Sequence, residues 1–162
     1  MSSPKNALRE RSERYLRSYQ KLCIYILIPF CLDFFAVVIG CISNSFHLYF
    51  SLGVTRFFLD LFTGMNMVPL TLVPSFLILA CYFGATVLAA KGKLFAVIGA
   101  TTLYTADLGV LIAYFITHLE GADVAVYILS IVVHTLFLVL FAFMIIYYAK
   151  ATKALREEKK GQ

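Results

Sequence analysis

Residues 22–44 read LCIYILIPFCLDFFAVVIGCISN, an apolar run in which Asp33 is the single charged side chain. An α-helix needs about 20 predominantly apolar residues to cross a hydrocarbon core roughly 30 Å thick. The run meets that requirement and therefore predicts a first membrane-spanning helix. A cleaved secretory signal is a poorer interpretation, because Asp33 interrupts the apolar stretch and no small-residue A-x-A site follows it.

A second interpretation of the same run stays open. Val38-Ile39-Gly40-Cys41 resembles the cleavage box of a bacterial lipoprotein, which would make Cys41 the lipidated first residue of the mature chain. The carboxylate of Asp33 within the preceding apolar stretch argues against cleavage. We therefore expect an intact first span.

Three further apolar runs predict spans two, three and four at residues 67–90, 94–118 and 124–149. The 162-residue chain is 61% hydrophobic and only 14% charged, whereas about a quarter of the residues of a soluble domain are charged. Its length suits one membrane domain covering residues 1–162, without a separate soluble module. We therefore expect an all-α, polytopic integral membrane protein that forms a four-helix transmembrane bundle.

Residues 46–65 are apolar but carry polar side chains at intervals of three to five positions, including His47, Thr55, Arg56 and Asp60. This spacing gathers the polar side chains on one side of a helix. The pattern is typical of a helix that lies in the membrane interface. We therefore expect an extra interfacial amphipathic helix between spans one and two. A crossing here would also place both later basic clusters, the connection 91–93 and the tail 150–162, on the outside.

The basic residues are unevenly placed, and this predicts the orientation. Thirteen of the fourteen lie in the lead 1–21, the connection 91–93 and the tail 150–162. Four crossings put these segments on one side, which the positive-inside rule makes cytoplasmic. We expect both termini in the cytoplasm, at the cell membrane if the organism is bacterial, with the basic segments on anionic lipid headgroups. The net charge of +5 thus indicates a lipid partner and no nucleic acid.

Each predicted span carries a polar stripe, and three ionisable residues in these stripes lie at a common depth. With a rise of 1.5 Å per residue, Asp33 and Asp107 lie about 17 and 20 Å from the cytoplasmic ends of their predicted spans, and His134 lies about 15 Å from the outer end of its span. In a core of roughly 30 Å they are close to the midplane. A carboxylate exposed to lipid there costs at least about 2.5 kcal/mol, so both aspartates should face protein or water.

Six residues of the stripes form the candidate ion- or substrate-binding set. They are Asp33, Asp107, His134, Tyr104, Tyr82 and Ser130. Two carboxylates and an imidazole at one depth could hold a proton, a cation or a cationic substrate, which indicates a small binding or transport protein. The alternative is a non-catalytic accessory or scaffold subunit, in which polar side chains form interhelical hydrogen bonds worth about 0.6 kcal/mol each. A membrane-embedded lipid enzyme is the third hypothesis.

The sequence predicts no catalytic residue, metal site or cofactor. Its four cysteines lie in apolar runs without the spacing of a metal site. His47 and His118 lie towards the outer end, so His134 has no histidine at matching depth with which to hold haem. There is no H-E-x-x-H motif and no G-x-x-x-x-G-K-[ST] phosphate loop. A chain of this size should need a homo-oligomer or a membrane partner to build a transport pathway.

Overall fold

The computed structural model describes residues 4–43, 52–118 and 124–160, and every element within them is helical. The elements are α1 (Pro4–Cys23), η1 (Ile24–Ile26), α2 (Ile28–Ser43), α3 (Gly53–Gly64), η2 (Val68–Thr71), α4 (Leu72–Ala90), α5 (Leu94–Thr117) and α6 (Val124–Lys160). Four helical stretches are long and apolar enough to cross a membrane, namely Arg9–Ser43, Val68–Ala90, Leu94–Thr117 and Val124–Ala154. This agrees with the four apolar helices expected from the sequence and indicates a multi-pass membrane protein.

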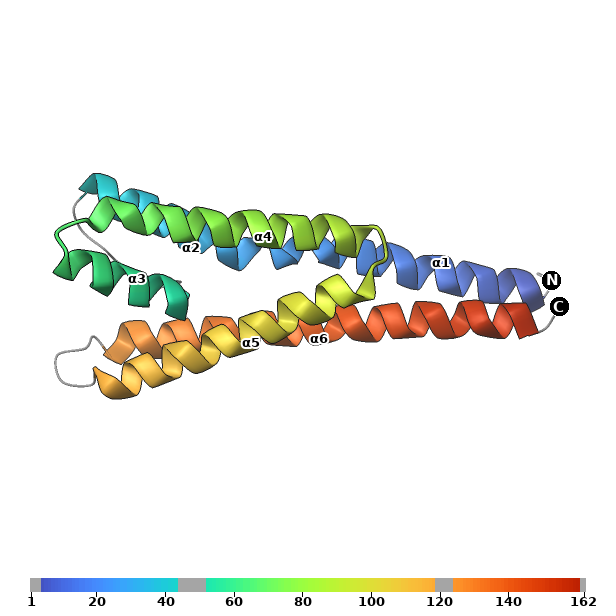
Figure 1. Ribbon diagram of the computed structural model, residues 1–162. Helices are drawn as coiled ribbons and strands as arrows, with labels where there is room; N and C mark the ends of the chain where they lie inside the picture. The colour runs from blue at the N-terminus through green and yellow to red at the C-terminus, as the bar shows by residue number, and fades with distance from the viewer. Residues whose placement is uncertain (1–3, 44–51, 119–123, 161–162) are drawn as a thin grey trace.

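The helices form an elongated bundle in which α4 and α5 make a V (Figure 1). They meet at the short connection 91–93 and diverge towards the opposite end, where α3 lies between them. Helix α2 packs along α4, and α6 packs along α5. Helix α3 also packs on α5, so it acts as a wedge in the open end of the V. This wedge positions the candidate site described below.

Prolines account for the irregular starts of the first two spans. Pro29 lacks a backbone N–H, so it cannot continue the hydrogen-bond ladder to Tyr25, and the chain there forms the 3₁₀ turn η1 before α2 begins. Pro69 similarly lies in η2 and Pro74 in the first turn of α4, where backbone N–H groups have no partner within the helix in any case. These two prolines therefore lie in a 3₁₀ entry to α4 and in its first turn.

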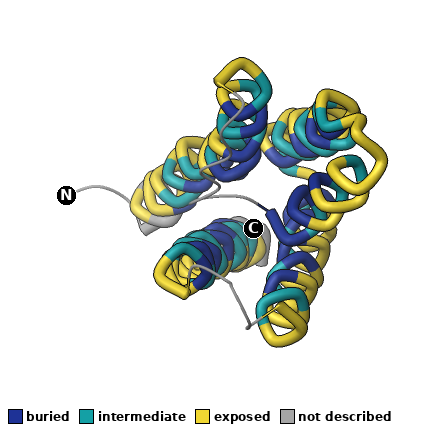
Figure 2. Tube along the Cα trace, turned by 90° about the vertical axis from the view of Figure 1, so that its left-hand side faces the viewer, coloured by how far each residue is buried: buried dark blue, intermediate teal, exposed yellow. Residues whose placement is uncertain are grey.

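The buried face of each long helix carries the polar stripe expected from the sequence. Among the described residues, Asp33, Ser75, Asp107 and His134 are all buried. Figure 2 shows the buried positions, in dark blue, on the sides of the helices that face one another. His118, by contrast, is exposed at the end of α5. Large apolar side chains cover much of the outside, as expected of helices that face lipid.

Helices α1 and α6 continue past the V as a two-helix extension, so both ends of the described chain leave at the same end of the molecule (Figure 1). Tyrosine rings join the two helices: Tyr19 meets Tyr148 edge-on with centroids 5.2 Å apart, and Tyr15 lies 6.2 Å from Tyr147. The Tyr19 hydroxyl donates to the carbonyl oxygen of Ala89 at 2.9 Å. This bond ties the extension to the last turn of α4.

Helix α3 was expected to lie in the membrane interface with its polar side in contact with water. In the structure, some of these polar side chains face the other helices instead. Residues 46–51 of the expected helix lie outside the described residues, and the described helix begins at Gly53. Thr55 and Arg56 are 0% and 8% exposed and point into the bundle, whereas Asp60 and Thr63 are exposed. The polar spacing of three to five residues predicted a helix with a polar side, but the first turn of α3 directs that side at other helices.

Candidate functional site at the buried N-terminus of α3

The N-terminus of α3 lies inside the bundle, where its free backbone N–H groups need acceptors. The first four N–H groups of any α-helix have no partner within the helix. The N-cap residue here is Leu52, which is 2% exposed and has no side-chain oxygen with which to cap the helix. Other parts of the chain must therefore supply the acceptors.

Two aspartates from different spans supply them. The carboxylate of Asp33, on α2, accepts the backbone N–H of Leu52 at 2.8 Å and the hydroxyl of Thr55 at 2.8 Å. The carboxylate of Asp107, on α5, accepts the backbone N–H groups of Gly53 at 3.0 Å and Val54 at 2.9 Å. Negative charge is also favoured at this position by the helix dipole, which places about half a positive charge at an N-terminus. The two aspartates thus hold one helix end between the first and third spans.

Gly53 allows the backbone of α3 to approach α5 closely enough for this capping. A Cβ atom at Gly53 would lie 2.5 Å from the backbone nitrogen of Leu111 and 2.8 Å from the carbonyl oxygen of Asp107. Both are backbone atoms of α5, so they cannot move aside as a flexible side chain could. Any other residue at this position would push α3 away from the Asp107 carboxylate.

His134, on α6, joins the site from the other side of Asp107. Its Nδ1 lies 2.8 Å from the carbonyl oxygen of Ser130, and its Nε2 lies 3.2 Å from Oδ2 of Asp107. A carbonyl oxygen can only accept, so we assign a hydrogen to Nδ1. The contact between Nε2 and Oδ2 then requires one proton, held by either the nitrogen or the oxygen. Asp107 and His134 are therefore close enough for one proton to lie between them.

Arg56, on α3, adds a positively charged side chain to the cluster. Its Nη2 donates to the hydroxyl of Ser130 at 3.2 Å, and its guanidinium carbon lies 4.4 Å from the ring centre of Tyr127. Both partners are on α6, so the guanidinium lies across the face of that helix as a cation over an aromatic ring. Arg56 was expected among the polar side chains of an interfacial helix, and the structure instead buries it against a span.

The structure brings together four of the six candidate residues directly. Asp33 and Asp107 cap the same turn, His134 contacts Asp107, and Ser130 contacts both Arg56 and the ring of His134. Sequence reasoning missed the roles of Gly53, Thr55 and Arg56. These residues are visible in the sequence as a glycine and two polar residues within an apolar segment. Helix periodicity predicts that the polar residues share one side of the helix, but it does not predict whether that side contacts water or other helices.

The two candidate tyrosines lie beside this cluster. The ring of Tyr104 stacks on His134 with centroids 4.8 Å apart, and its buried hydroxyl has no hydrogen-bond partner among the described residues. The ring of Phe30 lies between Tyr82 and Tyr104, and Tyr82 stacks on it with ring centroids 3.4 Å apart. The Tyr82 hydroxyl donates to the carbonyl oxygen of Ala100 at 3.4 Å. Tyr104 thus packs against the Asp107–His134 pair, whereas Tyr82 has no hydrogen bond to either carboxylate.

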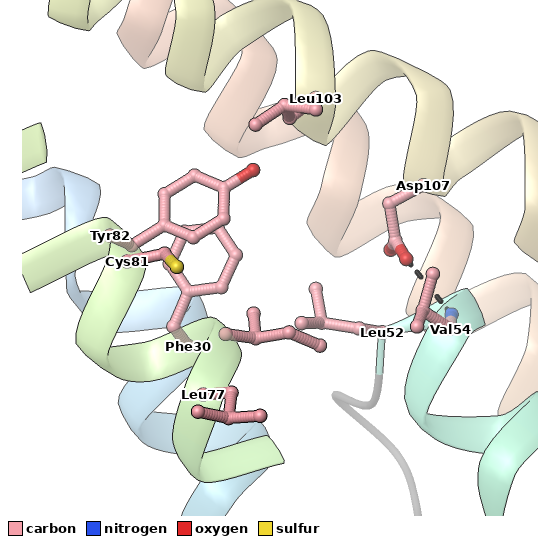
Figure 3. A pocket seen from close by; sticks show the side chains of 9 residues that line it. Phe30, Leu52, Val54, Leu77, Cys81, Tyr82, Leu103 and Asp107 are labelled. Atoms are coloured by element: carbon pink, nitrogen blue, oxygen red, sulfur yellow. Dashed lines mark hydrogen bonds between the residues drawn. The ribbon is translucent and has the colours of Figure 1, made fainter. Parts of the chain in front are cut away.

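A cavity of about 310 Å³ lies next to Asp107 (Figure 3). Its walls come from α2, α4, α5 and the start of α3, and they include the rings of Phe30 and Tyr82. Asp107 is the one charged residue among the nine described residues that line it. A ligand in this cavity would meet apolar and aromatic walls with a carboxylate at one end.

No three His, Cys, Asp or Glu side chains of the described part of the chain gather closely enough to hold a metal ion. Comparison with protein-family models, with curated proteins and with solved structures finds no match to this chain.

Proposed function

We propose that this chain is a small membrane binding and transport protein that exchanges the proton shared by Asp107 and His134 for a cation or a cationic substrate. The observation that carries the proposal is the contact between Nε2 of His134 and Oδ2 of Asp107, at the edge of an apolar cavity. Intramembrane ionisable residues of this kind commonly mark the path of an ion or a proton.

The charges of the cluster favour an exchange of one cation for one proton. Counted with both carboxylates ionised, Asp33 and Asp107 bring two negative charges and Arg56 brings one positive charge, so one proton on the Asp107–His134 pair makes the sum for these four side chains zero. An uncompensated charge buried among helices is costly. A cation that reached Asp107 could replace this proton without changing the balance, and His134 would then release the proton as a neutral imidazole.

The cavity favours a cation with an apolar body. The faces of Phe30 and Tyr82 attract positive charge through their π-systems, and Asp107 supplies the opposite charge. A transport cycle would require the bundle to open to each side in turn around this fixed site. In the same proposal the termini are cytoplasmic, the C-terminal part of α3 lies at the outer interface, and a second copy or a membrane partner completes the pathway.

The exchange is tested with benzyltrimethylammonium, a permanent cation with an aromatic ring, and with neopentylbenzene, its uncharged isostere. Calorimetry of the detergent-solubilised protein in two buffers of different ionisation enthalpy gives the number of protons released. We expect the cation to bind and the isostere not to bind. We also expect release of about one proton per ligand, and therefore an affinity that rises up to tenfold per pH unit while the pair is protonated.

The discriminating variant is His134→Gln, with His118→Gln as its matched control. Glutamine can still donate to Asp107 but holds no exchangeable proton, so we expect binding without proton release and without pH dependence. His118 is exposed at the end of α5, and its replacement should change neither quantity. If the wild-type protein binds no cation, or if His134→Gln releases as many protons as the wild type, the exchange proposal is wrong.

The orientation is tested separately by impermeant thiol labelling. Single cysteines are placed near Arg9, at Gly92 and near Lys153 in a chain from which the four native cysteines have been removed. We expect all three to be labelled only after the cells are permeabilised, because the basic segments should remain inside. Labelling near Lys153 in intact cells would exclude the four-span topology with cytoplasmic termini.

One observation favours a second function, that of an accessory or scaffold subunit. Both carboxylates already accept hydrogen bonds from the first turn of α3, which is a structural role that needs no ligand. In this case no probe should bind, and His134→Gln should leave the cellular function of the protein unchanged.

A further inference from the structure

A second cavity, of about 360 Å³, lies between α4 and α5, closer to the connection 91–93. Small residues make room for it on both walls: Gly84 and Ala85 on α4, and Gly99 and Ala100 on α5. A Cβ atom added at Gly84 or Gly99 would meet no other atom within 4 Å, so the space beside both glycines is open. We call this cavity the α4–α5 groove.

The α4–α5 groove has the length and lining of a site for a hydrocarbon chain. Phe95 lines it in the first turn of α5 and Leu103 two turns further along, which at 1.5 Å per residue is a distance of about 12 Å. One leaflet contributes half of a hydrocarbon core roughly 30 Å thick, so a single acyl chain has a similar reach. Leu103 also lines the cavity beside Asp107, so the two cavities adjoin at the deep end of the groove.

Positive charge lies at the shallow end of the groove. Lys91 follows the last residue of α4 and Lys93 precedes the first residue of α5, and both are exposed. The N-terminus of α5 has no side-chain cap from Lys93, and its free N–H groups and dipole also favour an anion. An apolar groove thus ends at two lysines and a helix N-terminus, which is the arrangement that an acyl chain with a phosphate headgroup would complement.

We propose that the α4–α5 groove is a binding site for an anionic phospholipid of the leaflet that faces the chain termini. One acyl chain lies between the glycines of α4 and α5, and the phosphate lies at Lys91, Lys93 and the N-terminus of α5. This site is separate from the exchange of a cation at Asp107 and does not depend on it. The lipid would close the side of the V that the wedge helix α3 leaves open.

Native mass spectrometry of the full chain released from detergent measures the site directly. The probes are phosphatidylglycerol and phosphatidylcholine with identical acyl chains, added at equal concentrations. We expect phosphatidylglycerol to be retained preferentially, and we expect Lys91→Gln/Lys93→Gln to reduce that preference roughly thirty-fold, from the usual attraction of two basic residues to an anionic headgroup. Equal retention of the two lipids by the wild-type protein would overturn the proposal.

Filling the groove tests the position of the acyl chain. Gly99→Leu should abolish retention of phosphatidylglycerol, and Gly84→Leu should do so from the opposite wall. Gly109→Leu is the matched control, because Gly109 is also an exposed glycine of α5 with no atom within 4 Å of an added Cβ but does not line the groove. All three changes raise helix propensity, so each variant should fold.

These measurements distinguish a bound lipid from a second copy of the chain in the groove. They also distinguish the lipid site from the proposed cation-exchange site at Asp107. Retention by Gly99→Leu equal to that of Gly109→Leu would overturn the proposed position. A loss of dimer in Gly99→Leu with no change in lipid would show that a second copy of the chain occupies the groove, which also overturns it. Binding of benzyltrimethylammonium should survive Lys91→Gln/Lys93→Gln, so failure of the lipid site and failure of the exchange site are distinguishable.

Discussion

The two ends of the bundle are held together by different interactions. At the end of α3, two carboxylates, a histidine and an arginine surround a buried helix N-terminus. At the other end, α1 and α6 lie side by side, and their contacts include two tyrosine pairs and a hydrogen bond from the Ser12 hydroxyl to the carbonyl oxygen of Ala151. The difference follows from what each end presents: helices packed along their sides have satisfied backbones, whereas a buried helix end has free N–H groups that need strong acceptors.

This comparison predicts that substitutions at the α3 end are far more destabilising than those at the α1–α6 end. Buried carboxylates that accept several hydrogen bonds leave unsatisfied donors when they are altered. Contacts between rings on partly exposed helices leave fewer unsatisfied groups behind. Four substitutions, each read by thermal unfolding in detergent, test the comparison in order of decreasing effect.

Asp107→Asn should have the largest effect, a loss of about 3 kcal/mol. Both oxygens of Asp107 accept backbone N–H groups, so either orientation of the amide places an NH₂ donor against the N–H of Gly53 or Val54. An amide is therefore no conservative replacement here. Asp60→Asn, on the exposed side of α3, is the matched control and should be nearly silent. Equal stability of the two variants would contradict the prediction that the α3 end is the more sensitive one.

Gly53→Ala should cost about 2 kcal/mol, because its Cβ would lie 2.5 Å from the backbone nitrogen of Leu111 and force α3 off α5. Gly64→Ala, at the other end of α3, meets no atom within 4 Å and should be neutral or slightly stabilising. Hydrogen exchange of the α3 amides should accelerate only in the first variant. Unchanged exchange in Gly53→Ala would mean that α3 tolerates a wider separation from α5 than the structure indicates.

Tyr19→Phe should cost about 1 kcal/mol, the usual contribution of one neutral hydrogen bond. The change keeps the ring contact with Tyr148 and removes the hydroxyl, with its bond to the carbonyl oxygen of Ala89 and its contact with the Cys23 thiol. Tyr15→Phe is the control, since it keeps the ring beside Tyr147. A cost equal to that of Asp107→Asn would remove the proposed difference between the two ends.

Glu13→Gln should have the smallest effect, below about 0.5 kcal/mol. Glu13 pairs with Arg9 at 3.3 Å and with Arg17 at 3.6 Å, but all three side chains are largely solvent-accessible on α1. Water and salt screen such pairs, so raising the ionic strength should erase the remaining difference between variant and wild type. A larger cost that persists at high salt would show that α1 is more strongly buried than its side-chain exposure indicates.

The sequence by itself determined the helical spans and the inward direction of their polar residues. Length and apolar composition decide whether a helix can cross a bilayer, and the 3.6-residue period decides which side chains share a face. Both properties are local, so Asp33, Asp107 and His134 could be placed at one depth and on buried faces without knowledge of the fold. The candidate set therefore included the residues that the structure brings together, although their binding role stays a proposal.

Only the tertiary structure decided what those residues contact. The pattern of residues 46–65 fits an interfacial helix and a helix whose end is buried equally well, because periodicity does not identify the neighbour of a face. The approach of Gly53 to α5, the capping of α3 by two spans and the α4–α5 groove all depend on distances between residues far apart in the chain. Such distances are set by how the helices pack against one another, which no single segment encodes.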